Sequence, residues 1–211
     1  MKKRRKKHWL RKVVLSMIIL FIVAGGWFGF KLKQRVDEVK KWQNTVATVA
    51  KKYDISDYQN IILAIILTES KGNHVDLMQS SESKYGTTDQ VGTSEESIDN
   101  GVKFLAQAIK KAKSENVDIW TAIQSYNFGL SYIDFIQKNG KVSSVKLADQ
   151  YSKSKLAPLL GNETGEKYRY WHLQSILYNG GYLYKDGGNM FYAEIVKWNL
   201  RIMKIINSIF H

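Results

Sequence analysis

The chain of 211 residues contains no cysteine and a single proline. The absence of cysteine excludes a disulfide framework, a cysteine-ligated zinc ion and a thiol nucleophile. The scarcity of proline, together with apolar residues at helical intervals along most of the chain, predicts a mainly α protein. The hydrophobic fraction of 44% is enough for one sizeable core, so we expect a single folded domain.

The first thirty residues differ from the rest of the chain. Residues 1–12 hold eight basic side chains, and residues 13–30 form a run of 18 residues without a charge. At ~1.5 Å per residue in a helix, this run reaches ~27 Å, close to the thickness of a membrane's hydrocarbon core. We expect an uncleaved transmembrane helix, with the basic segment in the cytoplasm and the remainder outside the cell. A cleaved signal peptide is the alternative, because Ala24, Gly25 and Gly26 supply small residues.

Acidic residues are scarce, with 19 Asp and Glu against 32 Lys and Arg. The formal net charge is +13, and residues 1–12 carry +8 of it, which leaves 13 − 8 = +5 for the rest. A mildly basic surface outside a cell suits an anionic wall polymer or a membrane surface. We expect no nucleic-acid partner, because the strongest basic cluster is the membrane-topology signal and no base-stacking or zinc motif accompanies it.

Behind the anchor, the chain divides into two parts. Residues 31–55 are predicted to form a membrane-proximal helix, because apolar side chains fall on one face from position 37 to about 53. Residues 56–211 are predicted to form the folded domain that carries any further function. Within it we expect helices at 56–69, 93–113, 118–126, 132–136 and 190–209. The predicted N-terminal caps are Ser56 or Asp57, the Thr93–Glu96 capping box, and Asp118.

Aromatic residues gather before the last helix. Flat rings can stack on sugars, but aromatic clusters at helical spacing are more often core, and we favour the core interpretation. The cluster consists of Tyr168, Tyr170, Trp171, Tyr178, Tyr182 and Tyr184. The last helix is expected to bury Ile195, Trp198, Ile202 and either Ile205 or Ile206.

Glu69 is the leading candidate for chemistry. It ends an almost unbroken apolar run over residues 61–68 and is followed by Ser70, Lys71 and Gly72. Desolvation at the tip of a buried helix disfavours the carboxylate anion and raises its pKa, so we predict that Glu69 can hold a proton at neutral pH. A general acid for glycosidic bond cleavage requires this property.

Three short elements follow one another in the chain: Glu69-Ser70, Leu77-Met78-Gln79, and the segment 122–129 with Tyr126-Asn127. Together they resemble the lysozyme-like superfamily of goose-type lysozymes and soluble lytic transglycosylases. The string over residues 76–83 is similar to the Gram-positive, membrane-anchored branch, the muramidase domains of wall hydrolases, some of which are carried by conjugative elements. The resemblance covers roughly residues 61–129. The stretch between the first two elements is shorter than is usual in the family.

The resemblance implies a lysozyme-like helical domain that cleaves the β-1,4 bond between N-acetylmuramic acid and N-acetylglucosamine in peptidoglycan. Glu69 would be the general acid. Asp76 is our candidate for a second carboxylate, with an Asx turn or helix cap as the equal alternative. The resemblance also implies glycan-binding roles. The residues with this implied role are Gln79, Ser80, Ser81, Glu82, Tyr126 and Asn127. Glu82 is also a weaker candidate for the second carboxylate.

Some questions stay open at this level. Attack by water would leave a reducing muramic acid end, whereas attack by the sugar's own 6-hydroxyl would give a 1,6-anhydro end, as in lytic transglycosylases. A peptidoglycan-binding assembly factor of an export or conjugation apparatus, without turnover, is the alternative from another class. We expect no cofactor and no metal, because His74 has no partner at ligand spacing.

Overall fold

The computed structural model describes residues 2–80 and 91–210, without the side chains of residues 2–8, 10 and 11. This described part is mainly α-helical, as predicted. In chain order the helices are α1 (Lys2–Lys40), α2 (Gln43–Lys52), the 3-10 turn η1 (Ser56–Tyr58), α3 (Gln59–Glu69), α5 (Ser94–Ser114), α6 (Ile119–Phe128), α7 (Ser131–Lys138), α8 (Val145–Tyr151), the π-helical turn η2 (Ser152–Leu156), α9 (Ala157–Leu159), α10 (Leu173–Asn179) and α11 (Tyr192–Phe210).

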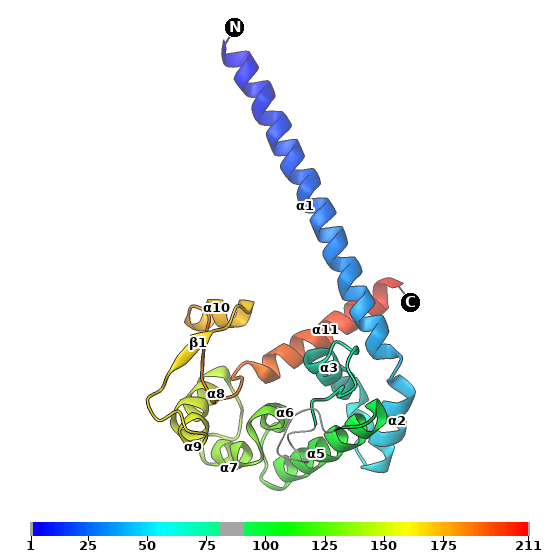
Figure 1. Ribbon diagram of the computed structural model, residues 1–211, viewed down its shortest axis with the longest axis vertical. Helices are drawn as coiled ribbons and strands as arrows, with labels where there is room; N and C mark the ends of the chain where they lie inside the picture. The colour runs from blue at the N-terminus through cyan, green and yellow to red at the C-terminus, as the bar shows by residue number, and fades with distance from the viewer. Residues whose placement is uncertain (1, 81–90, 211) are drawn as a thin grey trace.

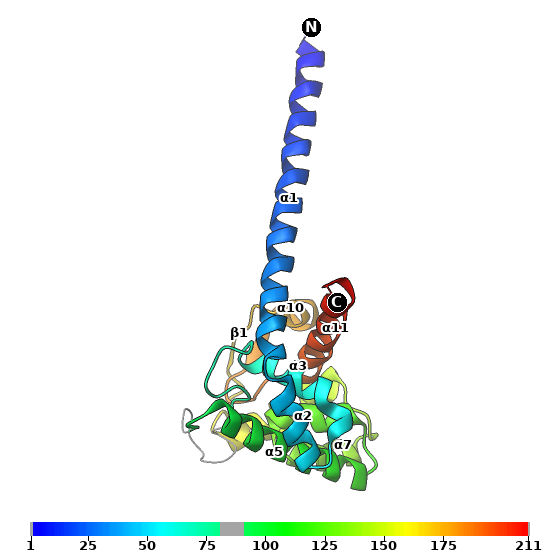
Figure 2. The same cartoon turned by 90° about the vertical axis from the view of Figure 1, so that its right-hand side faces the viewer.

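One continuous helix, α1, projects from the domain (Figures 1 and 2). Its part from Lys12–Lys40 is long and apolar enough to cross a membrane, and among the described residues it alone meets this test. The predicted membrane-proximal helix is wrong in its bounds, because its first ten residues, 31–40, belong to α1 and a turn at Lys41 and Trp42 separates α1 from α2. Val36 and Val39 of α1 are fully buried in the domain core. The projecting helix is therefore fixed to the domain by packing.

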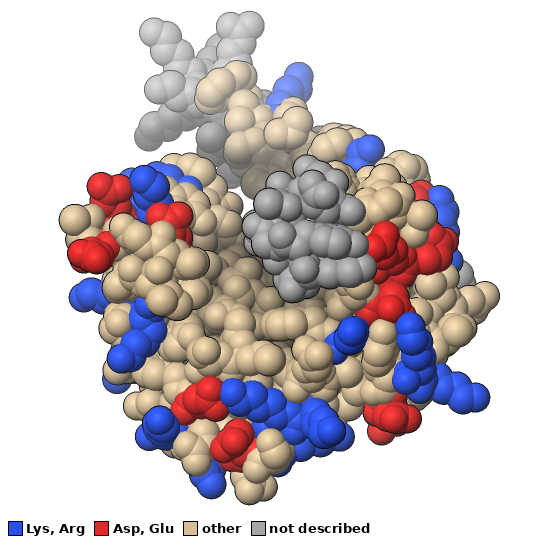
Figure 3. Space-filling view, turned by 60° about the horizontal axis from the view of Figure 1, so that its bottom comes forward, with Lys and Arg blue, Asp and Glu red and all other residues tan. Residues whose placement is uncertain are grey.

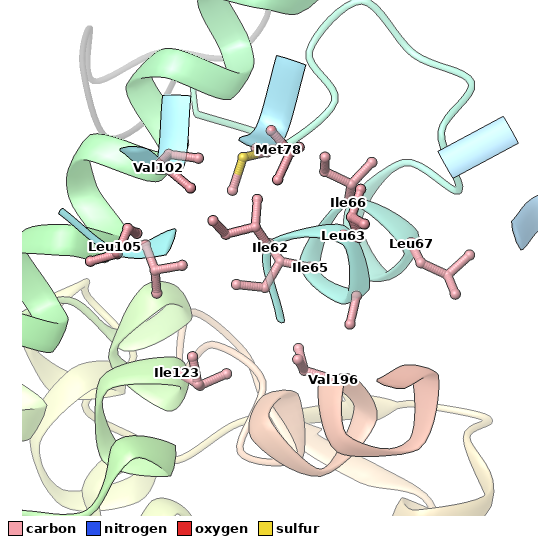
Figure 4. Close-up of a cluster of buried hydrophobic side chains, with 14 of the residues drawn as sticks. Ile62, Leu63, Ile65, Ile66, Leu67, Met78, Val102, Leu105, Ile123 and Val196 are labelled. Carbon is pink, nitrogen blue, oxygen red and sulfur yellow. The ribbon is translucent and has the colours of Figure 1, made fainter. Parts of the chain in front are cut away.

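The main core is built around α3, whose residues from Ile62 to Leu67 are all buried. This helix is apolar on every side because α2, α11 and the foot of α1 all pack against it. Figure 4 shows Ile62 and Ile65 among side chains from several elements, with Met78, Leu105 and Val196 around them. Complete burial of one such side chain contributes roughly 1.5–3 kcal/mol, so packing rather than helix propensity holds this β-branched helix in place.

A second cluster of buried residues supports the far end of α6. Phe128, Tyr132 and Tyr151 pack ring against ring, with centroids 5.1 to 5.4 Å apart. They come from α6, α7 and α8 and belong to the same cluster as Phe191, the residue just before α11. The cluster fixes the turn that follows Asn127, and so it positions part of the candidate site.

Two of the predicted helix caps are confirmed. The Thr93 hydroxyl accepts a hydrogen bond from the Glu96 amide at 3.1 Å, and the Glu96 carboxylate accepts one from the Gly92 amide at 3.2 Å. Asp118 accepts a hydrogen bond from the Trp120 amide at 3.2 Å. The third prediction is wrong. The 3-10 turn η1 precedes α3, and the residue before that helix makes no side-chain capping bond.

The stretch before α11 departs from the predicted helical pattern. β1 (Lys167–Arg169) and β2 (Tyr182–Tyr184) form an antiparallel pair in which Lys167 faces Tyr184, and α10 lies between them in the chain. This hairpin projects from the domain (Figure 1). The core interpretation of the aromatic cluster is therefore wrong for Tyr168, Trp171 and Tyr178, which are exposed. Tyr184 is buried, and Tyr170 and Tyr182 are half-buried.

The last helix also turns a slightly different face inward. Ile195 and Ile206 are buried as predicted, but Trp198 is 52% exposed, and Val196 and Met203 are buried. Val196, Met203 and Ile206 are seven and three residues apart and so share one face of the helix, whereas position 198, two residues after Val196, lies on another.

Charges of both signs are interspersed on the face that lies away from the projecting end of α1 (Figure 3). They surround an uncharged centre on that face.

Candidate functional site

Glu69 is the last residue of α3, and the chain turns sharply after it. Lys71 and Gly72 both adopt positive φ angles, 59° and 80°. A Cβ added at Gly72 would lie 2.8 Å from the backbone nitrogen of Val39 in α1, so a side chain there would meet backbone that cannot yield. Gly72 thus brings the turn after Glu69 against the foot of α1.

Tyr192 orients the Glu69 carboxylate. The buried Tyr192 hydroxyl donates a hydrogen bond to Oε1 of Glu69 at 2.6 Å. Burial, and then the nearby charge of Glu69, raise the pKa of Tyr192 well above its usual value of 10, so the phenol stays a proton donor at physiological pH. The Glu69 carboxyl is therefore held by a neutral donor from the first turn of α11.

Tyr126 stands behind Tyr192. The two rings are stacked with centroids 6.1 Å apart, and burial raises the pKa of Tyr126 well above 10, with Glu69 and then Asp76 adding to the effect. The Tyr126 hydroxyl donates to the Met78 carbonyl at 2.9 Å. Gly101 of α5 makes room for this contact, because a Cβ there would lie 2.7 Å from both the Tyr126 hydroxyl and the Met78 Cβ. Tyr126 therefore donates to the backbone of Met78, while Tyr192 donates to Glu69.

A groove of about 500 Å³ opens beside Glu69. Its walls come from α1, α3, the end of α6, the segment next to the hairpin, and α11. The lining residues are Leu32, Arg35, Val36, Leu67, Thr68, Glu69, Lys71, Asn127, Tyr170, His172, Asn189, Tyr192, Ile195, Asn199 and Ile202. Amide, hydroxyl and cationic groups face one carboxyl group across a space large enough for part of a glycan.

Asn127 joins the groove to the segment before α11. Its Oδ1 accepts a hydrogen bond from the Asn189 amide at 2.6 Å, and the Asn189 side chain donates to the Tyr170 hydroxyl at 3.1 Å. Gln124 of α6 also donates to the Asn189 carbonyl at 2.9 Å. A Cβ at Gly188 would lie 2.9 Å from Oδ1 of Asn127, so glycine allows this close approach. These bonds hold the far wall of the groove at a fixed distance from α6.

Asp76 lies in different surroundings. Its side chain accepts hydrogen bonds from the Ser97 hydroxyl at 2.6 Å and from the Ser80 amide at 2.9 Å, and the residue is 6% exposed. It does not line the groove beside Glu69. These contacts favour the alternative interpretation of Asp76 as a turn-fixing side chain, and its catalytic role stays a prediction.

Some of the other predicted site residues line the groove and some do not. Asn127 lines the groove, whereas Tyr126 lies behind it. Ser80 is buried, and its hydroxyl contacts Asp76 and Ser97, while Gln79 is exposed but not part of the groove wall. Ser81 and Glu82 lie outside the described residues. The proposed sugar contacts of all these side chains stay predictions.

No metal-binding group is evident in residues 2–80 and 91–210, where no three or more His, Asp or Glu side chains gather suitably. His74 accepts a hydrogen bond from the Asp76 amide at 3.3 Å through Nδ1.

The groove also includes residues that the sequence did not point to. Tyr192 lies 123 positions after Glu69, and Arg35 belongs to the projecting helix, so no local pattern connects either to the site.

Comparison with known proteins gives one family and several relatives. The family model described as Lysozyme-like matches residues 36–200. Pneumococcal vaccine antigen A of Streptococcus pneumoniae is 42% identical over 195 residues, which cover 92% of this chain and 94% of that protein. The bifunctional muramidase/DL-endopeptidase CwlT of Bacillus subtilis is 32% identical over 131 residues, 62% of this chain and 39% of CwlT. Neither relative is named for an export or conjugation apparatus.

A solved structure shares the arrangement of the domain. It belongs to a Staphylococcus aureus protein described as similar to a lipoprotein of the NLP/P60 family. The match has a TM-score of 0.70 at 37% identity and covers 78% of this chain and 52% of the other, so the chain spans about half of that protein.

Proposed function

We propose, because the chain belongs to the lysozyme-like family, that it cleaves the β-1,4 bond between N-acetylmuramic acid and N-acetylglucosamine in peptidoglycan, with Glu69 as the general acid. One observation carries the assignment. Glu69 faces a groove of about 500 Å³ while Tyr192 holds its carboxyl at 2.6 Å. The muramidase named among the relatives supports the same class of reaction.

The proposed reaction uses Glu69 twice. Its proton passes to the glycosidic oxygen as the bond from that oxygen to the sugar C1 breaks, and an oxocarbenium-like centre forms at C1. Glu69 is then an anion, which the Tyr192 hydroxyl stabilises by its hydrogen bond. Water adds to C1 and returns a proton to Glu69, so the acid is regenerated and a reducing end remains.

A second candidate product has its own support. The proposed second carboxylate, Asp76, is engaged by Ser97 and Ser80 and does not line the groove. A mechanism in which Glu69 is the only catalytic carboxyl group does not require a second carboxylate to position a water molecule. The 6-hydroxyl of the muramic acid residue could attack C1 instead and pass its proton to Glu69, which would give a 1,6-anhydro end without consuming water.

The location of the activity follows from α1. We infer that residues 13–30 span the membrane, that the basic residues 1–12 stay in the cytoplasm, and that residues 56–211 act on the wall outside the cell. The long apolar helix at the N-terminus supports a single-pass arrangement. Peptidoglycan glycan strands are the expected partner, and no cofactor enters the proposed reaction.

The test compares three full-length proteins on purified peptidoglycan: the natural chain, Glu69→Gln and Glu115→Gln. Glu115 is a matched control because it is also a helix-end glutamate, at the C-terminus of α5, but it does not line the groove. Released fragments are identified by mass spectrometry, which distinguishes reducing from anhydro ends by one water molecule. We expect release by the natural chain and Glu115→Gln alone. Equal release by all three would remove Glu69 as the general acid, and binding without release by any would favour the non-catalytic assembly factor.

A further inference from the structure

Two helices on the side of the domain from which α1 projects leave large apolar side chains uncovered. Trp171, Leu173 and Leu177 lie at or within α10, and Ile205, Ile209 and Phe210 end α11; all six are at least half exposed. We call these six residues the apolar rim. Scattered single apolar residues are ordinary on protein surfaces, but a group of this size calls for a partner.

The apolar rim lies on one side of the domain. Figures 1 and 2 both show α10 and the C-terminal end of α11 on the side from which α1 projects. The Lys33 ammonium is 5.4 Å from the centre of the Phe210 ring, which places the end of α11 beside that part of α1. Lys33 follows the end of the uncharged run 13–30 by three residues, ~4.5 Å along a helix. The rim therefore begins where the proposed transmembrane segment ends.

Cationic side chains accompany the rim. Arg169 lies 5.0 Å from the Trp171 ring, and Arg201 and Lys204 are exposed on α11 next to Ile205. Aromatic and aliphatic residues mixed with Arg and Lys are typical of helices that lie in a membrane interface, where the cations meet lipid phosphates. The opposite face, by contrast, carries charges of both signs (Figure 3).

We propose that the apolar rim is a membrane-docking surface that rests on the outer leaflet of the bilayer spanned by α1. A glycan is a poorer match, because four of the six residues are aliphatic and offer no flat ring for a sugar. A second copy of the chain would need to compete with a lipid surface that α1 keeps permanently within reach.

Docking has a consequence for the substrate, which rests on the proposed function. Leu32 and Arg35 of α1 line the groove that holds Glu69, and they follow the end of the uncharged run by two and five residues. With the rim on the membrane, the groove opens next to the lipid headgroups. The strands that the enzyme reaches are then those closest to the membrane, and strands farther out in the wall lie beyond it.

The natural absence of cysteine allows single nitroxide labels to be attached to the full chain in vesicles of phosphatidylcholine and phosphatidylglycerol. The labelled variants are Leu177→Cys, Phe210→Cys and the control Leu159→Cys. Leu177 and Leu159 are 77% and 78% exposed, and Leu159 lies on α9, away from α1 in Figure 1. Label accessibility to oxygen and to a water-soluble nickel chelate reports depth in the bilayer. We expect labels at 177 and 210 to be shielded from the chelate by about tenfold relative to 159.

Three results would overturn the docking surface. The first is equal access of the chelate to all three labels, which would mean that the rim does not dock. The second is shielding that grows with protein density and brings dipolar broadening between labels, which would indicate a second copy of the chain. The third is shielding that appears only when glycan is added, which would indicate a glycan. Circular dichroism checks that each variant is folded, and the two rim sites give independent readings. Repeating the labelling in Glu69→Gln separates the proposals, because docking is measured without turnover, whereas failure of the proposed function appears only in the fragment assay.

Discussion

Glu69 and Asp76 flank one short loop, yet their surroundings differ. Asp76 is almost fully buried, and donors from Ser97 and Ser80 occupy its carboxylate. Glu69 is half-buried, receives its hydrogen bond from the distant Tyr192, and faces the groove. Burial alone therefore does not mark a catalytic acid. A carboxyl group that acts on a substrate must be held by the protein and also face a space that the substrate can enter.

The largest effect is expected at Glu69. Glu69→Gln keeps the size and a hydrogen-bond acceptor for Tyr192 but removes the transferable proton, so the rate of glycan cleavage should fall ~10³-fold. The thermal unfolding midpoint should change little, because the side chain stays at the groove surface. Rates of fragment release, measured beside circular dichroism melts, check both statements. A loss below tenfold would remove Glu69 from the mechanism.

Tyr192→Phe should follow, with a loss of ~10- to 100-fold at the pH optimum, because the carboxyl group loses its orienting donor. The Tyr192 bond stabilises the anion of Glu69, so its removal should move the alkaline limb of the rate profile to higher pH. Tyr132→Phe is the matched control, since this tyrosine is buried in the other core cluster. A shift of the limb in both variants, or in neither, would contradict the assigned role of Tyr192.

Asp76→Asn sharpens the comparison further. If Asp76 fixes the turn, the cleavage rate per folded molecule should fall less than ~10-fold, while loss of the charged acceptor lowers the free energy of unfolding by ~1–2 kcal/mol. Urea titration gives the stability, and the fragment assay gives the rate. A loss of activity of ~100-fold or more without loss of stability would restore Asp76 as the second catalytic carboxylate.

A last prediction concerns pH and stability away from the groove. Burial raises the pKa of Tyr132 to about 12, against an ordinary value of 10 in the unfolded chain. The folded state thus keeps this proton when the unfolded state has lost it, so stability is complete below pH 10 and declines as the pH rises towards 12. The decline from this group is roughly 3 kcal/mol. Tyr132→Phe should show a weaker decline in alkaline urea titrations, and an identical slope in both proteins would contradict the assignment.

Much of the fold could be predicted where the signal is local. The buried α3, the capping box at Thr93 and the cap at Asp118 all depend on residues within a few positions of each other. The hairpin of β1 and β2 was missed, because its three-residue strands carry aromatic residues that also suit a helical core. Trp198 was misplaced since a small rotation of a helical stripe exchanges neighbouring positions.

The candidate site was predicted only in part, for the same reason. Glu69 stands out because an apolar helix ends at it, and Asn127 because it belongs to a recognisable segment. Tyr192 and Arg35 reach the groove through tertiary packing, and their identities and spacing carry no mark of it. The internal bonds of Asp76 could not be read from its position either, since Ser97 is 21 residues away.

The most direct measurement is a crystal structure of full-length Glu69→Gln bound to a peptidoglycan tetrasaccharide. If Glu69 is the general acid, one glycosidic oxygen should lie within ~3 Å of the residue 69 side chain, in the groove between α1, α3 and α11. A sugar chain bound elsewhere on the domain, or a glycosidic oxygen beside Asp76 and out of reach of residue 69, would contradict it.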